Sequence, residues 1–376
     1  MAKTIVFCAD GTWNGPGHGR DDAISATSTN VLRLFDLLAG AVTSDTDAAD
    51  GETERDLPGV QVSKYLAGVG VSSNPLVHLL GGGMGAGIIA RIVRGYTFIS
   101  RNYVAGDRIV LTGFSRGAYT ARALAGMIAA MGLLDAKKED LSDREAAYRA
   151  GVAVWFAYRR QAKLGDPLWL EQVDALAEDF TALLQAAPVL ARIAAVPITA
   201  IGVWDTVGSL GIPDPAAGDV FRFADTKLAA CVGQGFHAVS LDERRTSFEP
   251  TLWAADPRVV QMLFPGAHAD VGGGYDDAPT GLAACALGWM VERLAGCGVQ
   301  FAGAAPAGNP LGVAHQPWAE GLFAALPNAA RRFPAATLSL ADAVLSRQGA
   351  PYVLAAPGAV PVKYAPDAIP DVLRVA

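Results

Sequence analysis

The sequence predicts an α/β protein with a mostly parallel sheet that is covered by helices on both faces. The first observation behind this prediction is that short apolar runs rich in β-branched residues alternate along the chain with longer helical patterns. The second observation is the composition. Of the 376 residues, 51% are hydrophobic and 18% are charged, so the chain can bury a sizeable core.

Apolar runs and capping residues identify the first elements of the chain. A compact apolar run at 4–8 predicts a buried strand, and Thr29 or Asn30 caps a helix that we expect Gly40 to end. The elements expected before residue 104 are a strand at 4–8, a helix at 30–39, a solvated acidic loop at 44–56, a strand and turn at 60–71 and a helix at 88–103.

A second series of elements begins with an apolar run at 109–111, which predicts a strand, followed by an alanine-rich amphipathic helix. The remaining expected elements are a helical insertion at 135–195, strands at 196–203, 236–241 and 259–264, and a helix at 281–295. Beyond residue 299 the chain is rich in alanine and proline and has weak periodicity. We therefore expect residues 301–376 to be a C-terminal extension packed on the core that residues 1–300 form.

Charge, cysteine content and hydropathy exclude several classes of protein. The net charge is −7 and no basic stretch stands out, which argues against nucleic-acid binding. The four cysteines have no metal-ligand spacing, and we expect neither a metal nor a cofactor. No segment approaches the ~18 to 20 uninterrupted apolar residues of a membrane span, and the N-terminal apolar run is too short for a secretory signal. These features predict a cytoplasmic protein without an integral membrane segment, although export by a machine that reads no N-terminal signal would leave no trace in them.

The most informative pattern is Gly113-Phe114-Ser115-Arg116-Gly117, placed between a predicted strand and a predicted helix. Its glycines allow a turn so sharp that the serine takes a strained backbone conformation. The hydroxyl then projects above the sheet edge, beside the positive end of the following helix. The pattern predicts a nucleophile elbow, with Ser115 as the nucleophile of an α/β-hydrolase.

The helical insertion at 135–195 lies where such hydrolases commonly carry a lid, and plain packing helices explain it equally well. Its aromatic side chains offer either an apolar surface for transient membrane contact or ordinary core packing.

An activated serine needs a base within hydrogen-bond reach and an acid that orients the base, in the chain order serine, acid, histidine. His268 is the preferred base because it follows a strand and has glycines nearby. His237 is the second candidate, and its structural interpretation is a partly buried histidine bonded to backbone. Asp205 closely follows the strand at 198–203, on the same rim as Ser115, and is the preferred acid.

Two further aspartates, Asp242 and Asp270, are weaker candidates for the acid. Asp242 has the right chain order, but its dense charged neighbours favour a salt-bridged structural role. Asp270 is too near His268 in sequence to be the easy choice, and its alternatives are to organise the glycine loop or to bind a cation.

The developing oxyanion needs two hydrogen-bond donors. The backbone N–H of Arg116, directly after the nucleophile, is the expected first donor. Gly11 or Thr12, after the first predicted strand, is the expected second donor. The alternative interpretation is that Asp10-Gly11 is merely a turn.

Five blocks of the chain resemble the signature blocks of the DUF2235 family, which is also described as the catalytic domain of type VI secretion phospholipase effectors. The blocks are FCADGTWN, GFSRGAYTARALAGMI, GVWDTVGSLG, FHAVSLDERRTSFEPTLW and FPGAHADVGGGY, in the family's order between residues 7 and 275. The resemblance implies an α/β-hydrolase fold and an ester-cleaving site with Ser115, Asp205 and His268.

The resulting prediction is a serine hydrolase that cleaves carboxylic esters, of the lipase or phospholipase kind, through an acyl-enzyme. One alternative is an aspartate-dependent phosphatase that uses Asp10 as the nucleophile, although Thr12 stands where that chemistry normally wants a second aspartate. The other alternative is a hydrolase-like binding or scaffolding protein without turnover.

Overall fold

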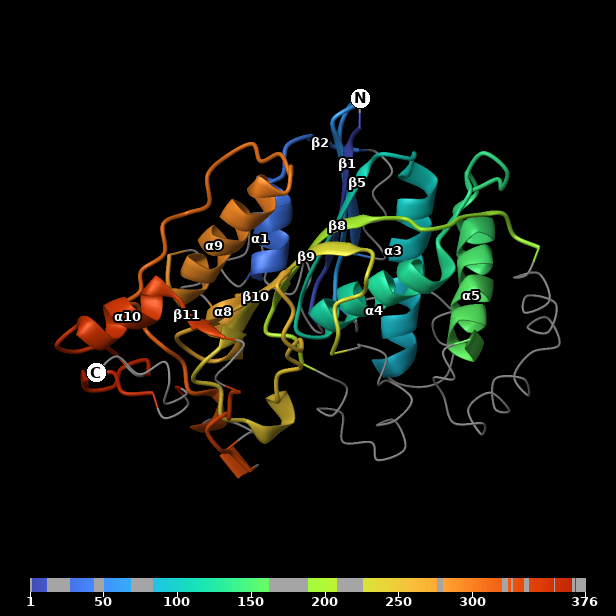
Figure 1. Cartoon of the computed structure of the whole chain (residues 1–376). Helices are drawn as coiled ribbons and strands as arrows, with labels where there is room; N and C mark the ends of the chain where they lie inside the picture. Colours follow the sequence, from blue (N-terminus) through green and yellow to red (C-terminus); the bar gives the residue numbers. More distant parts are fainter. Residues whose placement is uncertain are drawn as a thin grey trace.

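The computed structural model describes residues 2–11, 28–43, 51–68, 84–161, 189–207, 226–275, 280–319, 324–325, 327–334, 338–354, 356–366 and 369. Its centre is a nine-stranded sheet (Figure 1). The strands, in spatial order, are β11 (Ser339–Leu340), β10 (Val259–Phe264), β9 (Val232–Ser240), β8 (Ile198–Trp204), β5 (Arg108–Phe114), β1 (Thr4–Ala9), β4 (Gln61–Leu66), β3 (Glu52–Leu57) and β2 (Ala41–Val42). All neighbours from β11 to β4 pair in parallel, and β3 and β2 complete one edge by antiparallel pairing. The predicted mostly parallel sheet is confirmed.

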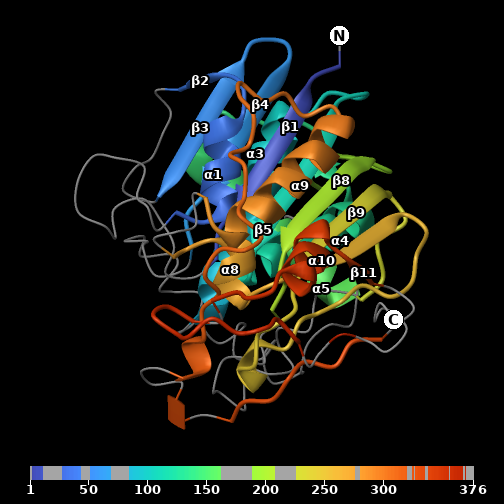
Figure 2. The ribbon, with the colours of Figure 1, turned by 90° about the vertical axis from the view of Figure 1, so that its left-hand side faces the viewer.

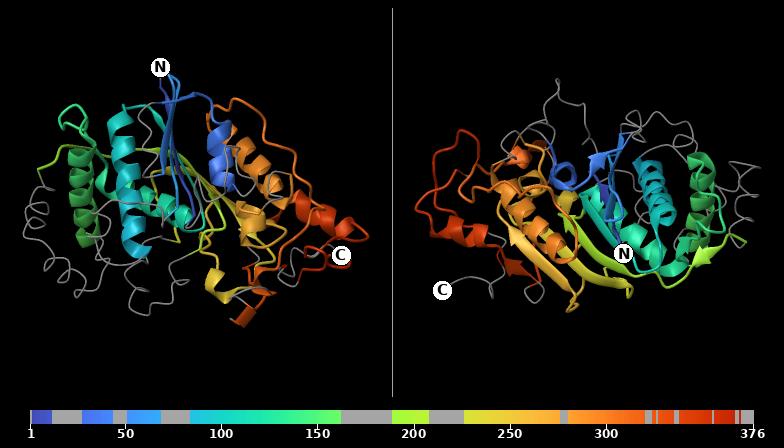
Figure 3. Two further views of the ribbon diagram at one scale, coloured as in Figure 1. Left: turned by 180° about the vertical axis from the view of Figure 1, so that it is seen from behind. Right: turned by 90° about the horizontal axis from the view of Figure 1, so that it is seen from above.

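Helices cover both faces of this sheet, as the views from the side and from above show (Figures 2 and 3). On one face lie α1 (Asn30–Leu37) and α9 (Leu282–Gly296), and on the other lie α3 (Met84–Asn102), α4 (Arg116–Met131) and α5 (Arg144–Gln161). The alternation of side chains along β1 divides the core accordingly. Phe7 packs with the α3–α4–α5 layer, whereas Val6 packs with α1 and α9. The fold is an α/β-hydrolase-like fold.

The first helix follows its predicted boundaries closely. The hydroxyl of Thr29 accepts a hydrogen bond from the backbone N–H of Leu32 at 3.2 Å, which is an N-cap. The helix ends at Leu37, before the Gly40 that was expected to end it.

The acidic segment at 44–56 was expected to be a solvated loop, and this is wrong for its second half. Residues 44–50 lie outside the described residues, but Glu52 and Glu54 belong to β3 and are buried. Lys64 of β4 forms ion pairs with both glutamates, and Arg94 of α3 pairs with Glu52. These cations come from other segments, so the strand buries its acidic side chains as paired charges.

The described part of the insertion at 135–195 is mainly α5 and a two-stranded sheet of β6 (Leu133–Leu134) and β7 (Arg192–Ile193). Its aromatic residues Tyr148, Trp155, Phe156 and Tyr158 are all buried in the core cluster of α3 and α4, so they serve core packing. Residues 162–188 lie outside the described residues. Within the described ranges, none of the helices has both the length and the apolarity of a membrane span.

The tail beyond residue 300 contributes β11 and α10 (Asp342–Gly349). β11 extends the sheet by pairing with β10, and Leu338 and Val344 pack on Val239 and Leu263 in a separate apolar cluster. The tail therefore lies against the same half of the sheet as β9 and β10.

Candidate active site

Ser115 occupies the turn between β5 and α4, with φ 57° and ψ −121°. This is the left-handed half of backbone space that a residue with a side chain rarely adopts. Two glycines make the turn sterically feasible. A Cβ on Gly113 would lie 2.3 Å from the carbonyl oxygen of Gly117, and a Cβ on Gly117 would lie 2.1 Å from that of Ala9. The strand, sharp turn and helix predicted around Ser115 are present.

Asp205 lies beside this turn because β8 is the neighbour of β5. Phe114 pairs with Trp204, and the backbone N–H of Ser115 donates to the carbonyl of Trp204 at 3.1 Å. Ser115 and Asp205 are each the next residue after this pair, so both emerge at the carboxyl edge of the sheet. Asp205 also has a positive φ, of 34°.

His268 is the first residue of the short helix α8 (His268–Gly272), which follows β10. Its Nδ1 lies 2.6 Å from Oδ2 of Asp205. Its ring packs against Phe114, the residue before Ser115, at 4.5 Å between centroids, and edge-on against Phe248 at 5.0 Å. The structure thus brings the predicted acid and base together next to the elbow. Among the described residues, no hydrogen bond joins the Ser115 hydroxyl to His268. Such bonds often tighten only when substrate binds.

The Asp205 carboxylate is completely buried and accepts four hydrogen bonds. Oδ1 accepts from Nη1 of Arg331 at 2.7 Å and from the backbone N–H of Ser240 at 2.9 Å. Oδ2 accepts from Nη2 of Arg331 at 2.9 Å and pairs with His268. Burial alone would raise the pKa of Asp205, but the charge of Arg331 and the bond to His268 hold that pKa well below its usual range. Asp205 is therefore a carboxylate at all physiological pH values.

Burial lowers the pKa of His268, and the carboxylates of Asp205 and Glu243 oppose this effect only in part. The imidazole is therefore neutral at pH 7, as a general base must be. If Nδ1 carries the proton toward Asp205, Nε2 is the free acceptor.

Glu243 is a site residue that the sequence reasoning missed. Its Oε2 accepts a hydrogen bond from the backbone N–H of His268 at 3.1 Å, and both of its oxygens bind the side chain of Arg245. The charged run at 242–245 was a signal for this ion pair, but the interpretation assigned it to Asp242. Asp242 instead accepts from the backbone N–H of Gly266 and from the hydroxyl of Tyr364.

His237 takes the structural role that was its alternative interpretation. It is completely buried in β9, where its Nε2 accepts the backbone N–H of Thr206 at 3.0 Å and its Nδ1 lies 3.3 Å from Oε1 of Gln261. Burial lowers the pKa of His237 to about 3, which keeps the ring neutral. His237 thus fixes the backbone directly after Asp205.

Asp10 lies at the end of β1, and its buried carboxylate is fully engaged. It accepts hydrogen bonds from the backbone N–H of Gly11 at 2.7 Å, the hydroxyl of Thr29 at 2.6 Å and the hydroxyl of Tyr65 at 2.7 Å. Burial raises the pKa of Asp10 to about 6. The Gly11 amide is therefore directed to Asp10 in this structure, and Thr12 lies outside the described residues.

Asp270 organises the segment around His268, as one of its alternatives anticipated. Its Oδ2 accepts the backbone N–H groups of Ala267 and His315, and its Oδ1 lies 2.6 Å from Nδ1 of His315. His315 comes from the tail and stacks on Tyr275. Among the residues that the structure describes, no group of three or more His, Cys, Asp or Glu side chains is arranged to hold a metal ion.

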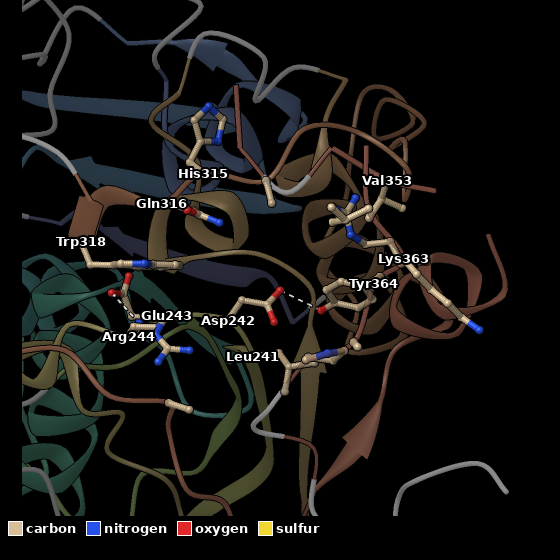
Figure 4. Close-up of a pocket in the computed structure, with 16 residues that line it drawn as sticks. Leu241, Asp242, Glu243, Arg244, His315, Gln316, Trp318, Val353, Lys363 and Tyr364 are labelled. Carbon is tan, nitrogen blue, oxygen red and sulfur yellow. Dashed lines mark hydrogen bonds between the residues drawn. The ribbon is translucent and has the colours of Figure 1, made fainter. Parts of the chain in front are cut away.

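A cavity of about 340 Å³ lies between the segment after β9 and the tail (Figure 4). Its polar lining includes Asp242 and Arg244. The hydroxyl of Tyr364, which also lines the cavity, donates a hydrogen bond to Asp242. Trp318 of the tail adds an aromatic side chain. Ser115 and His268 do not line this cavity.

A mostly parallel sheet, an elbow serine and an aspartate–histidine pair at the same sheet edge define an α/β-hydrolase-like protein. The chain belongs to the family of T6SS phospholipase effector Tle1-like catalytic domains, whose model matches residues 3–293.

An uncharacterised protein of Saccharomyces cerevisiae (YEL023C) is 28% identical over 274 residues, which are 69% of this chain and 34% of that protein. The chain thus spans about a third of this curated relative. Two solved structures are more distantly similar. A crystal structure of an uncharacterised protein from Pseudomonas aeruginosa has a TM-score of 0.48 and 18% identity, over 80% of this chain and 46% of that one. The Tle1 effector bound to the VgrG spike from the type 6 secretion system has a TM-score of 0.37 and 17% identity, over 73% of this chain and 51% of that one.

Proposed function

We propose that this protein is a serine hydrolase that cleaves carboxylic esters of lipids through an acyl-enzyme, with Ser115 as nucleophile, His268 as base and Asp205 as acid. The observation that carries the proposal is the 2.6 Å contact between Nδ1 of His268 and Oδ2 of Asp205 beside the strained turn at Ser115. A buried carboxylate that holds a neutral imidazole next to an elbow serine has the arrangement that activates a hydroxyl.

In the proposed reaction, Nε2 of His268 takes the proton of the Ser115 hydroxyl as Oγ attacks the ester carbonyl. Asp205 holds the proton on Nδ1 and stabilises the imidazolium. The backbone N–H of Arg116, at the start of α4, donates to the oxyanion, where the helix dipole also favours negative charge. The imidazolium returns its proton to the leaving alcohol, and a water molecule then releases the acid and regenerates Ser115.

Membership of a phospholipase effector family supports a phospholipid as the natural ester. The same membership supports secretion as part of the proposal. The phosphatase alternative is less well supported, because the Asp10 carboxylate accepts three hydrogen bonds and burial favours its protonated form.

A fluorophosphonate probe tests the nucleophile. We expect it to label the wild-type protein and Ser142→Ala, in which an exposed loop serine is removed, but not Ser115→Ala. Hydrolysis of a short nitrophenyl ester and of phosphatidylcholine vesicles then separates simple esters from phospholipids. Labelling that persists in Ser115→Ala would refute the assignment, and no labelling of the wild type or of either variant would favour binding without turnover.

A further inference from the structure

Arg331 brings a charge from the tail into the centre of the proposed site. It precedes β11 in the tail, directly after Ala330, which lines the cavity of Figure 4, and it is 4% exposed. Its two terminal nitrogens bind the two oxygens of Asp205 side by side, at 2.7 and 2.9 Å. This bidentate geometry is the strongest and most directional form of an arginine–carboxylate pair.

We propose that Arg331 is a positioning residue of the proposed triad, whose guanidinium clamps both oxygens of Asp205 so that Oδ2 stays opposite Nδ1 of His268. The inference rests on the proposed function. It also makes the tail beyond residue 300 a functional part of the active site rather than an accessory to the hydrolase core.

The clamp leaves the carboxylate no freedom to rotate. Each oxygen of Asp205 accepts two hydrogen bonds, and Arg331 supplies one bond to each oxygen. Without Arg331, Oδ1 keeps only the backbone N–H of Ser240 and Oδ2 keeps only His268. The carboxylate plane can then turn about the Cβ–Cγ bond, and the imidazole loses its fixed partner.

Arg331 also binds the backbone of a residue whose ring packs on the imidazole. Its Nη1 donates to the carbonyl of Ser240 at 2.8 Å, and its Nη2 donates to the carbonyl of Phe248. The ring of Phe248 packs edge-on against His268. The same guanidinium therefore fixes both the carboxylate of Asp205 and a residue that packs on the imidazole.

The electrostatic consequence distinguishes positioning from mere stabilisation. The charged groups that act on His268 are the carboxylates of Asp205, after β8, and of Glu243, after β9, and the cation of Arg245. Arg331 acts on His268 through its ion pair with Asp205. His237, which also lies near Asp205, is neutral. Removal of Arg331 leaves the Asp205 charge uncompensated, so the imidazole binds its proton more tightly. The acid limb of the reaction then moves to higher pH.

The test compares Arg331→Met and Arg331→Lys with Arg332→Met, which removes the exposed neighbouring cation. The measurement is the second-order rate of fluorophosphonate labelling between pH 5 and 9, with thermal unfolding recorded in parallel. We expect Arg331→Met to label at least about tenfold more slowly, with its acid limb raised by about one pH unit. Arg331→Lys restores the position of the limb, because it keeps the charge, but only part of the rate. Arg332→Met behaves like the wild type.

A folded Arg331→Met that labels within twofold of the wild type, with an unmoved acid limb, overturns the inference. If that variant does not fold, Arg331→Lys decides, because an unchanged labelling rate in it shows that the bidentate clamp is dispensable. Failure of the proposed function has a different signature, namely labelling that survives in Ser115→Ala.

Discussion

Gly117, in the first turn of α4, lies directly against the carbonyl group of Ala9 at the end of β1. A Cβ added to Gly117 would lie 2.1 Å from the backbone carbonyl oxygen of Ala9 and 2.6 Å from that of Asp10. The turn that carries Ser115 therefore rests on the backbone of the central strand, and no side chain can be inserted between them without moving one of the two.

The first prediction follows from this contact. Gly117→Ala forces the elbow and the end of β1 apart, because the added Cβ would clash with backbone atoms of Ala9 and Asp10, which cannot rotate out of the way as a side chain can. We expect the variant to lose about 1–3 kcal/mol or more of folding free energy and to label much more slowly with a fluorophosphonate. The matched control is Gly288→Ala in α9, where an added Cβ meets nothing within 4 Å. That change is expected to stabilise the protein by about 0.5–1 kcal/mol, as replacement of a helix-interior glycine does. Equal stability of the two variants would contradict the packing argument.

The second prediction separates the two histidines by the same substitution. His268→Phe removes the proposed base, and we expect fluorophosphonate labelling to fall by roughly 10²- to 10⁴-fold. His237→Phe removes the acceptor of the Thr206 N–H and leaves that buried donor unpaired, which costs about 1–3 kcal/mol of stability. Its labelling rate falls far less. The measurements are labelling rates and urea unfolding curves, and a reversed order of labelling rates would make His237 the base.

The third prediction concerns the pH dependence of labelling. The proposed base acts in its neutral form, and burial lowers the pKa of His268 below its ordinary value of 6.5. As the pH falls through this lowered pKa, the imidazole gains a proton and the rate declines. We therefore expect the midpoint of the acid limb to lie below pH 6.5. Circular dichroism over the same range separates the titration from unfolding, and a midpoint at or above 6.5 would contradict the assignment.

The fourth prediction concerns Asp242, the second candidate for the acid, whose carboxylate contacts Gly266 and Tyr364 rather than His268. Asp242→Asn is expected to retain labelling, whereas Asp205→Asn loses it. Burial raises the pKa of Asp242 to about 6 in the folded protein, whereas an unfolded aspartate titrates near 3.9. The folded state thus binds the proton of Asp242 more tightly than the unfolded state does. The stabilisation that this proton provides is lost as the pH rises through about 6.

The asparagine in Asp242→Asn does not titrate, so this variant does not lose stability in that way as the pH rises. Urea unfolding at pH 4.5 and 7.5 is therefore expected to show that the variant gains stability relative to the wild type at the higher pH. A difference in stability that is the same at both pH values would argue against a raised pKa.

The residues at the strand ends were predictable because each follows its own apolar run. Ser115, Asp205 and His268 come after β5, β8 and β10, and the carboxyl ends of parallel strands share one edge of a sheet. The turn at Ser115 carried a local signal as well, in its two glycines.

Partners from distant segments carried no such signal. Arg331 lies in a tail with weak periodicity, far from Asp205 in the chain, and nothing in its neighbourhood predicts a buried guanidinium. For the same reason β3 was mistaken for a loop. The buried charges of Glu52 and Glu54 are compensated by cations on β4 and α3, which only the assembled sheet brings near.

The position of β1 has a consequence for how the chain folds during synthesis. β1 lies between β4 and β5, whose residues begin only at Gln61 and Arg108. Both edges of this apolar strand therefore stay unpaired until the later strands have left the ribosome. Contacts so distant in sequence slow folding, and unpaired strand edges of this kind are prone to aggregation while the chain is incomplete. Since the turn at Ser115 rests on the end of β1, its native packing requires that β1 be in place.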